Sequence, residues 1–163
     1  MSDIESARRD YLKLRDQSSS VHLATLSHDT SPEASYAPCV WFGGNCYVLL
    51  SELASHTRNL RNDPSIGLLL VEPESAAGNA FARKRVSLNG KVQVVARDHD
   101  SYQAVMGEFH RRFGEVMQLI APLPDFHLFR IDVQSGKFIR GFGQAYELSG
   151  DAMEQLTHID PAK

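Results

Sequence analysis

Three cations lie together at the start of the segment FARKRVSLNGKVQVV, residues 81–95. Apolar and polar residues alternate in this segment, which is typical of a strand with one buried face. The face predicted to be buried carries Val86, Leu88, Val92 and Val94, and the opposite face carries Arg83, Arg85, Ser87, Asn89 and Lys91. Guanidinium and ammonium groups on a rigid strand suit the carboxylates or the phosphate of an anionic ligand. The alternative is that this polar face is simply in contact with solvent.

A second group of candidate residues begins a short predicted helix, ELASHTRNLRN, residues 52–62. Thr57 and Arg58 lie near its start, where backbone N–H groups commonly bind phosphate. None of the seven histidines has the spacing or the neighbours of a zinc site. No local motif assembles a Ser-His-Asp or Cys-His arrangement for nucleophilic catalysis. Cys39 and Cys46 fall in apolar stretches, and we expect both to be buried, reduced thiols.

The bulk composition is that of an ordinary globular protein. The chain has 163 residues, of which 42% are hydrophobic and 23% are charged, so we expect one domain over residues 1–163. A formal net charge of −3 argues against general nucleic-acid binding, which rests on many phosphate contacts. No apolar run approaches the roughly 18 residues of a membrane span. The N-terminal segment MSDIESARRDYLKLRDQ lacks the apolar stretch of a signal peptide, so we expect a cytoplasmic protein.

Periodicity and turn residues predict the elements that position these side chains. A helix is predicted over residues 2–17, with Ser2 and Glu5 spaced as a capping box. Strands are predicted at 20–27, 34–42, 46–51 and 65–72. Asn89-Gly90 favours a hairpin within 81–95. The apolar alternation continues through that pair, however, so we favour one long strand with Gly90 at a bend or bulge.

The second half of the chain predicts one long helix and two more strands. The helix runs to about residue 120, with Asp100 as its N-cap and Pro122 beyond its end. The strands cover 126–133 and 137–148, with 134–136 as the connection and with Gly141 and Gly143 on one strand face. Ser149 is predicted to cap a short helix in the C-terminal segment 149–163. About six mostly antiparallel strands with few helices predict a mainly β protein, a small β-barrel with helices against it.

The order of the motifs resembles that of the pyridoxamine 5′-phosphate oxidase-like split-barrel family. The opening strand, turn and strand of that family resemble LATLSHDTSPEASYAP in this chain. The step from helix to strand that the family also has is similar to SHTRNLRNDPSIGLLLVE. SHTRNL, FARKR, HRRFGE, PDFHLFRID and GFGQAYELSGD resemble its HutZ/HugZ haem-utilisation branch, over roughly residues 6–158. The resemblance implies a six-stranded antiparallel split barrel of the kind found in FMN-binding proteins. It also implies a homodimer with ligand clefts between the two subunits. The ligand is FMN in the wider family and haem in this branch, where some members degrade haem oxidatively and release its iron.

The resemblance also assigns roles to the basic residues. Arg85 matches an arginine near the open face of the haem iron, where a charged donor could hydrogen-bond dioxygen or peroxide. From the residues alone, Arg83 and Lys84 are candidates to bind the propionates of haem or the phosphate of FMN, and the alternative is that they simply face solvent. His56 matches a position where flavin-binding relatives often carry a lysine that grips the FMN phosphate. A histidine has an ordinary pKa near 6.5 and is a poorer fixed cation, which counts against FMN.

The axial iron ligand in this branch comes from a C-terminal segment that reaches across the dimer, near an aspartate that matches Asp125. We expect Asp125 to take part in catalysis with Arg85. His158 is the histidine of the C-terminal segment, and the resemblance makes it the predicted haem-iron ligand. Family members commonly extend further, with another histidine, so His158 is alternatively a neighbour of the ligand position. His127 shares a strand face with Asp125 and either lines the same cleft or packs at the interface.

Three functions follow from these features. The first is haem binding with oxidative haem degradation and iron release. The second is an FMN-dependent oxidoreductase acting on a small molecule, which the basic strand and the start of the predicted helix favour and His56 disfavours. The third is a non-catalytic haem carrier that uses the same cleft and leaves the haem intact.

Overall fold

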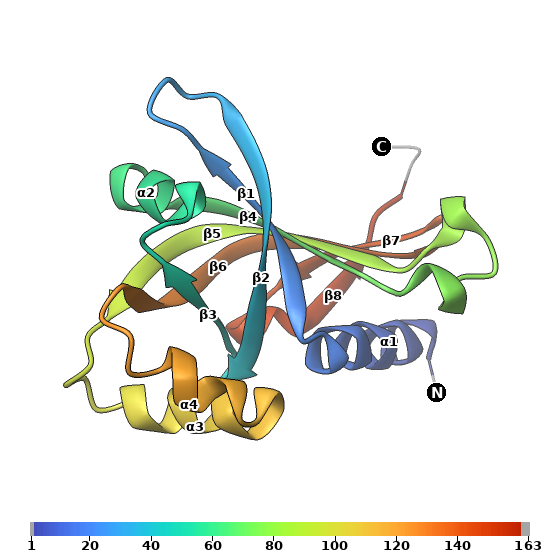
Figure 1. Ribbon diagram of the computed structural model, residues 1–163. Helices are drawn as coiled ribbons and strands as arrows, with labels where there is room; N and C mark the ends of the chain where they lie inside the picture. Colours follow the sequence, from blue (N-terminus) through green and yellow to red (C-terminus); the bar gives the residue numbers. More distant parts are fainter. Residues whose placement is uncertain (1, 161–163) are drawn as a thin grey trace.

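Eight strands form one sheet in the computed structural model, which describes residues 2–160 (Figure 1). The strand order is β3-β2-β1-β4-β5-β6-β7-β8, and an additional β3–β6 pairing closes the first six into a barrel. All the pairings are antiparallel, and β7 and β8 extend the sheet beyond β6. The strands are β1 (Ser20–Leu26), β2 (Pro32–Phe42), β3 (Asn45–Ser51), β4 (Ser65–Val71), β5 (Arg85–Val95), β6 (Phe126–Gly141), β7 (Gln144–Ser149) and β8 (Gln155–His158). The predicted six-stranded antiparallel barrel is confirmed.

Helices cover the barrel on several sides. They are α1 (Asp3–Gln17), α2 (Ser55–Asn62), α3 (Tyr102–Phe113) and α4 (Val116–Ile120), with short 3₁₀ turns at Glu74–Ala76, Ala80–Ala82 and Asp151–Met153. The capping box predicted from Ser2 and Glu5 is present at the start of α1. Among the described residues, no helix is both long enough and apolar enough to cross a membrane.

Two hydrophobic clusters hold these layers together. The first fills the barrel and includes Tyr11 of α1, which is 0% exposed, with Cys39 and Cys46, which are buried as predicted. The second lies on the outer side of the barrel, where Phe109 of α3 packs with Val40 and Leu128. The strands between the two clusters are therefore covered on both faces, and α1 is anchored against the barrel where the first strand begins.

The segment 81–95 forms one strand, as predicted, and not a hairpin. The β5–β6 register shifts between Asn89 and Gly90, which marks the expected irregularity. The prediction that Val94 faces the core is wrong, because Val94 is 57% exposed and Val95 is buried instead. The reason is that Val95 packs into the α3 cluster, on the opposite face from the barrel interior.

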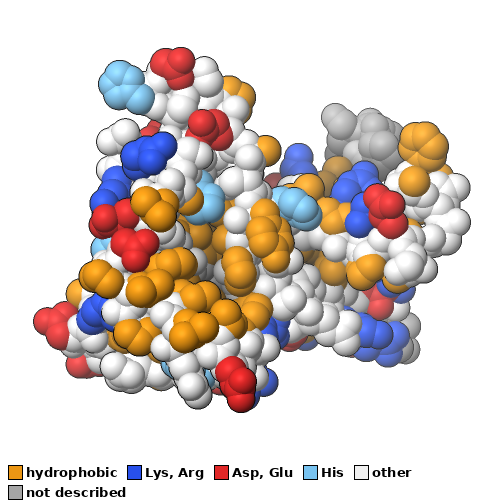
Figure 2. Space-filling model, in the orientation of Figure 1, with side chains coloured by type: hydrophobic (Ala, Val, Ile, Leu, Met, Phe, Trp, Pro, Cys, Tyr) orange, Lys and Arg blue, Asp and Glu red, His pale blue; other side chains and the backbone are white. Residues whose placement is uncertain are grey.

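The predicted long helix is interrupted. Gly114 adopts a φ of +69° and separates α3 from α4, and the N-cap is Ser101, not Asp100. Figure 2 shows apolar side chains gathered over α3 and α4 on the side of the molecule that it displays. The exposed ones on α4 and beside it are Val116, Leu119 and Leu123. α4 therefore buries Met117 and leaves much of its apolar surface uncovered.

Three further predictions in the C-terminal half are wrong. β6 continues through residues 134–136, and the chain reverses after Gly141 at Phe142 and Gly143, where the latter has a φ of +65°. Gly141 and Gly143 therefore do not share a strand face. The helix capped by Ser149 does not form: a 3₁₀ turn leads into β8, which pairs with β7 and buries Leu156. A strand forms there instead of a helix, because β7 would otherwise leave its outer edge unpaired. The predicted C-terminal segment continues to residue 163, and residues 161–163 lie outside the described residues.

Candidate functional site

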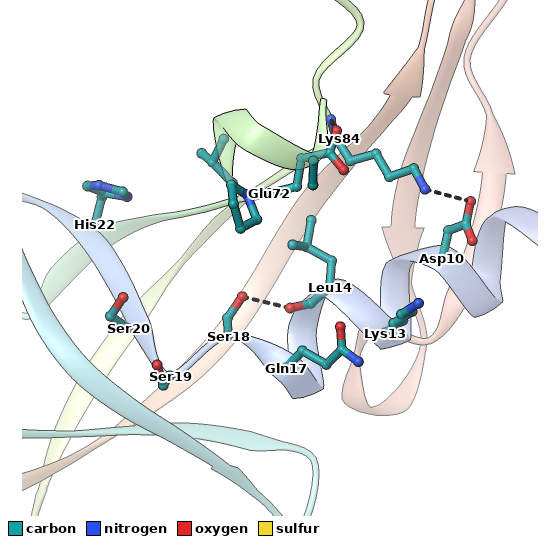
Figure 3. Close-up of a pocket in the computed structure, with 13 residues that line it drawn as sticks. Asp10, Lys13, Leu14, Gln17, Ser18, Ser19, Ser20, His22, Glu72 and Lys84 are labelled. Carbon is teal, nitrogen blue, oxygen red and sulfur yellow. Dashed lines mark hydrogen bonds and ion pairs between the residues drawn. The ribbon is translucent and has the colours of Figure 1, made fainter. Parts of the chain in front are cut away.

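A cavity of about 540 Å³ opens between α1, the start of β1 and the end of β4 (Figure 3). Its walls combine apolar and charged groups. The apolar contribution comes from Leu14, Val71, Pro73 and Ala76. The polar and charged contribution comes from Asp10, Lys13, Gln17, Ser18, Ser19, Ser20, His22, Glu72 and Lys84. This mixture of apolar surface and a few charged groups is typical of a small-molecule site.

Lys84 brings part of the predicted basic segment to this cavity. Its ammonium lies 3.3 Å from Asp10 Oδ2 on α1. Arg140 also donates to Asp10 Oδ2, at 2.9 Å from its Nε. Burial alone would raise the pKa of Asp10, but the hydrogen bonds from Arg140 and Lys84 outweigh it and hold that pKa below its ordinary value. Asp10 is therefore ionised at neutral pH, and its charge is offset by two cations.

Arg83 and Arg85 lie beside the cavity and do not line it. Arg83 Nε donates to the Glu72 carbonyl oxygen at 2.6 Å, and Arg83 Nη1 lies 3.4 Å from Glu74 Oε1. Arg85 Nη1 donates to the Arg83 carbonyl oxygen at 2.9 Å. Glu72 in turn accepts from the Lys84 N–H at 2.7 Å. The two arginines therefore hold the connection between β4 and β5 in place, and cofactor contacts by either remain a prediction.

His22 also lines the cavity, although no motif in the sequence selects it. It lies on the outer face of β1, paired with Leu69 of β4, and its Nδ1 is 3.3 Å from the Leu69 carbonyl oxygen. A strand-forming pattern alone does not indicate that one exposed position faces a helix across a cavity. Only the position of α1 relative to β1 reveals this histidine.

The start of α2 lies away from this cavity. His56 Nδ1 is 2.9 Å from Ser35 Oγ on β2, and burial lowers the pKa of His56, although the carboxylate of Glu33 opposes the shift. Thr57 is buried, and its hydroxyl donates to the Ser51 carbonyl oxygen at 2.5 Å. Arg58 is exposed. A neutral His56 and an internally bonded Thr57 make this helix start a weak phosphate site.

Asp125 belongs to a separate polar cluster, which lies where β3 ends and β6 begins. Ser51 Oγ donates to Asp125 Oδ2 at 2.8 Å, and the Glu52 N–H donates to the Asp125 carbonyl oxygen at 2.8 Å. His127 Nε2 lies 2.7 Å from Glu52 Oε1, which also pairs with Arg61. Within one protomer the structure does not bring Asp125 together with Arg85, so a shared catalytic role remains a prediction.

His158 lies on β8, outside the cavity described above. Its Nε2 is 3.1 Å from the Gly143 carbonyl oxygen in the turn between β6 and β7, and its ring packs edge-on against Tyr146 at 5.4 Å. Iron ligation by His158 remains a prediction.

Residues 7–140 match the pyridoxamine 5′-phosphate oxidase family. The chain belongs to this family. It is 36% identical over 148 residues to the haem oxygenase HutZ of Vibrio cholerae, covering 91% of this chain and 84% of HutZ. The crystal structure of HutZ from Vibrio cholerae, described as a haem storage protein, superimposes with a TM-score of 0.73 at 32% identity, over 77% of this chain and 89% of that one. Campylobacter jejuni ChuZ superimposes with a TM-score of 0.87 at 27% identity, over 100% of this chain and 68% of that one. The haem-utilisation branch of the family is thus the one that this chain resembles.

Proposed function

We propose that this protein binds haem and acts in haem utilisation, with oxidative degradation of haem and release of iron as its activity. The observation that carries the proposal is the 36% identity to a haem oxygenase over most of both chains. The mixed apolar and charged lining of the cavity beside α1 supports the proposal.

The residues of the cavity suit a haem group. The macrocycle is apolar and fits against Leu14, Val71 and Pro73, while the propionates need cations such as Lys13 and Lys84. The two carboxylates in the wall are already engaged, since Asp10 meets Arg140 and Lys84 and Glu72 accepts from the backbone of Lys84. A cavity of about 540 Å³ is also within the usual range for cofactor sites.

Haem, when bound, supplies the redox chemistry, and the chain supplies binding, orientation and electrostatics. In this proposal Lys84 and Lys13 orient the propionate edge. Arg85 has five N–H donors, so its bond to the Arg83 carbonyl still permits a contact with the ligand. The Ser51 hydroxyl holds the Asp125 carboxylate, which we propose positions an iron-ligating histidine such as His158 across a dimer interface.

The protein is further proposed to act as a cytoplasmic homodimer. Exposed apolar side chains support pairing, because Tyr36 on the outer face of β2 is 58% exposed and Leu119 on α4 is 74% exposed. Light scattering on a size-exclusion column tests this part of the proposal, which predicts the mass of two chains. A single-chain mass at every protein concentration would contradict it.

The alternative is an FMN-dependent oxidoreductase, which the family match supports. The lowered pKa of His56 argues against it, because the histidine is then neutral where a phosphate would require a cation. A third function, haem carriage, is supported by the description of HutZ as a storage protein.

Reaction of the haem-loaded protein with ascorbate and dioxygen separates degradation from carriage. Degradation predicts that the haem absorption bleaches and that a ferrous chelator captures about one iron per haem. Haem absorption that survives these conditions unchanged would overturn the degradation proposal and favour the carrier. Free hemin under the same conditions is the control for protein-independent bleaching.

A further inference from the structure

A tyrosine and a histidine lie ring against ring where β7 and β8 pair, beside α1 (Figure 1). Tyr146 is the register partner of His158, and their ring centroids are 5.4 Å apart in an edge-on arrangement. Tyr146 is 0% exposed, so the strand pairing and the surrounding core hold its ring in place. His158 is the predicted haem-iron ligand of this chain. An oxidisable side chain therefore adjoins the residue that is expected to contact the haem iron.

The hydroxyl of Tyr146 has a proton acceptor in place. It donates to Asp3 Oδ2 on α1 at 2.9 Å, which is within the reach that proton transfer requires. Burial and this hydrogen bond raise the pKa of Tyr146, although Arg140 opposes the shift, so the resting phenol keeps its proton at neutral pH. A phenol that loses an electron becomes strongly acidic. The Asp3 carboxylate can then take the proton as the electron leaves.

The hydrogen-bond network of Tyr146 also reaches the cavity beside α1. Arg140 Nη1 lies 3.1 Å from Asp3 Oδ1, and Arg140 Nε donates to Asp10. Asp10 lines the cavity and pairs with Lys84, the proposed partner of a haem propionate. Tyr146 is therefore connected to the proposed haem site by this network as well as by its ring contact.

The other tyrosines do not combine these features. Of the five, all of which fall within residues 2–160, Tyr146 is the one whose hydroxyl donates to a carboxylate. Tyr11 is equally buried and lies 5.9 Å from Phe138, which in turn lies 6.2 Å from Tyr146. The Tyr11 hydroxyl has no hydrogen-bond partner within residues 2–160, and the Arg15 guanidinium lies 5.8 Å from the centre of its ring. The nearby cation opposes removal of an electron from Tyr11, and its phenol proton has no acceptor.

We propose that Tyr146 is a redox-active residue that donates one electron to haem that hydrogen peroxide has oxidised. The electron passes from Tyr146 to the haem, the phenol O–H bond breaks, and the proton passes to Asp3 Oδ2. The oxidised haem is thereby reduced by one electron, and Tyr146 is left as a neutral radical. An external reductant such as ascorbate then restores the phenol. This inference rests on the proposed haem binding.

The test is electron paramagnetic resonance of the ferric, hemin-loaded protein, frozen shortly after mixing with hydrogen peroxide. Tyr146→Phe keeps the ring and removes the phenol, and Asp3→Asn removes the proton acceptor. Tyr11→Phe is the matched control, because it removes a hydroxyl from an equally buried ring. Each variant is first compared with the wild type by circular dichroism and by hemin titration. Protein that contains ring-deuterated tyrosine identifies a tyrosyl signal by its narrower lines.

The proposal predicts a tyrosyl radical in the wild type and in Tyr11→Phe, its loss in Tyr146→Phe and a weaker signal in Asp3→Asn. A radical in Tyr146→Phe as strong as that of the wild type would overturn the redox role and leave haem binding intact. A wild type that binds hemin and consumes peroxide without forming a tyrosyl radical would overturn it too. An unchanged signal in Asp3→Asn would overturn proton transfer to Asp3. A wild type that binds no hemin would overturn the proposed function, and the redox role with it.

Discussion

Arg140 on β6 and Asp10 on α1 form an ion pair in which Arg140 Nε lies 2.9 Å from Asp10 Oδ2, and both side chains are about four-fifths shielded from solvent. The same guanidinium reaches Ser6 at 2.7 Å, so one side chain ties two turns of α1 to the sheet. Asp10 also meets Lys84 at the cavity. The pair therefore connects the anchoring of α1 to the charge of the candidate site.

Replacing Arg140 with Ala should lower the free energy of unfolding by about 1–3 kcal/mol, because a shielded carboxylate loses its hydrogen-bonded cation. Hemin affinity should fall as well, since α1 forms one wall of the cavity. Urea unfolding and hemin titration measure the two effects. Arg9→Ala, an exposed arginine of the same helix, is the control and should change stability by less than about 0.5 kcal/mol. Equal stability of the two variants would contradict the anchoring role.

Gly90→Ala should be destabilising by about 1–3 kcal/mol, because the added methyl group would lie under 3.0 Å from the Asp132 backbone on β6. Gly107 in α3 has nothing within 4 Å of an added methyl group. Gly107→Ala should therefore stabilise the protein by about 0.5–1 kcal/mol, through the helix preference of alanine. Thermal unfolding of both variants gives the sign of each change. A stable Gly90→Ala protein would show that β5 does not need its bulge.

The stability of the protein should decrease below about pH 6.5 in a manner that depends on His56. Burial lowers the pKa of His56 in the folded state below the 6.5 of an unfolded chain, so the unfolded chain binds more protons as the pH falls. The contribution of the neutral His56 is full above the unfolded pKa and is lost as the pH falls through the folded pKa. Urea unfolding at about pH 7.5 and about pH 5.5 should show a smaller loss for His56→Gln than for the wild type. Equal losses of stability in the wild type and in His56→Gln would show that the pH dependence arises from other groups.

Asn59→Ala should lower the free energy of unfolding by about 1–3 kcal/mol. The buried Asn59 amide donates to Thr25 Oγ1 at 3.0 Å and to the carboxylate of Glu33. Without it, a buried hydroxyl and a partly buried carboxylate lose their donor. Asn62→Ala, at an exposed position near the end of the same helix, is the control for changes of helix propensity. Equal shifts of the denaturant midpoint in Asn59→Ala and Asn62→Ala would contradict a stabilising role for the hydrogen bonds of Asn59.

Local patterns predicted the barrel most clearly where a strand alternates between a buried and a more exposed face, as β1, β4 and most of β5 do. The β4 sequence SIGLLLV shows such an alternation in the structure, and β5 shows it as far as Val92. The pattern failed at Val94, which is exposed, because α3 covers the neighbouring Val95 on the other face of the strand, and only tertiary packing positions α3. It failed again at 150–158, because the helix-like composition of that segment is overridden by pairing with β7.

The candidate site was less predictable than the fold. Lys84 was selected from the basic segment and does line the cavity, whereas its neighbours Arg83 and Arg85 hold the β4–β5 connection. His22 lines the cavity without any local signal in the sequence, because its place there depends on a helix that precedes it in the chain and lies across the cavity from it. Relationships of this kind depend on the packing of distant segments, which a single sequence does not display.

Titration of the purified protein with hemin and, in parallel, with FMN distinguishes haem binding from flavin binding. We expect a Soret band that saturates at about one hemin per chain, together with no retention of FMN after gel filtration. A protein that retains FMN and shows no saturable hemin spectrum would contradict haem binding and identify the flavin enzyme instead.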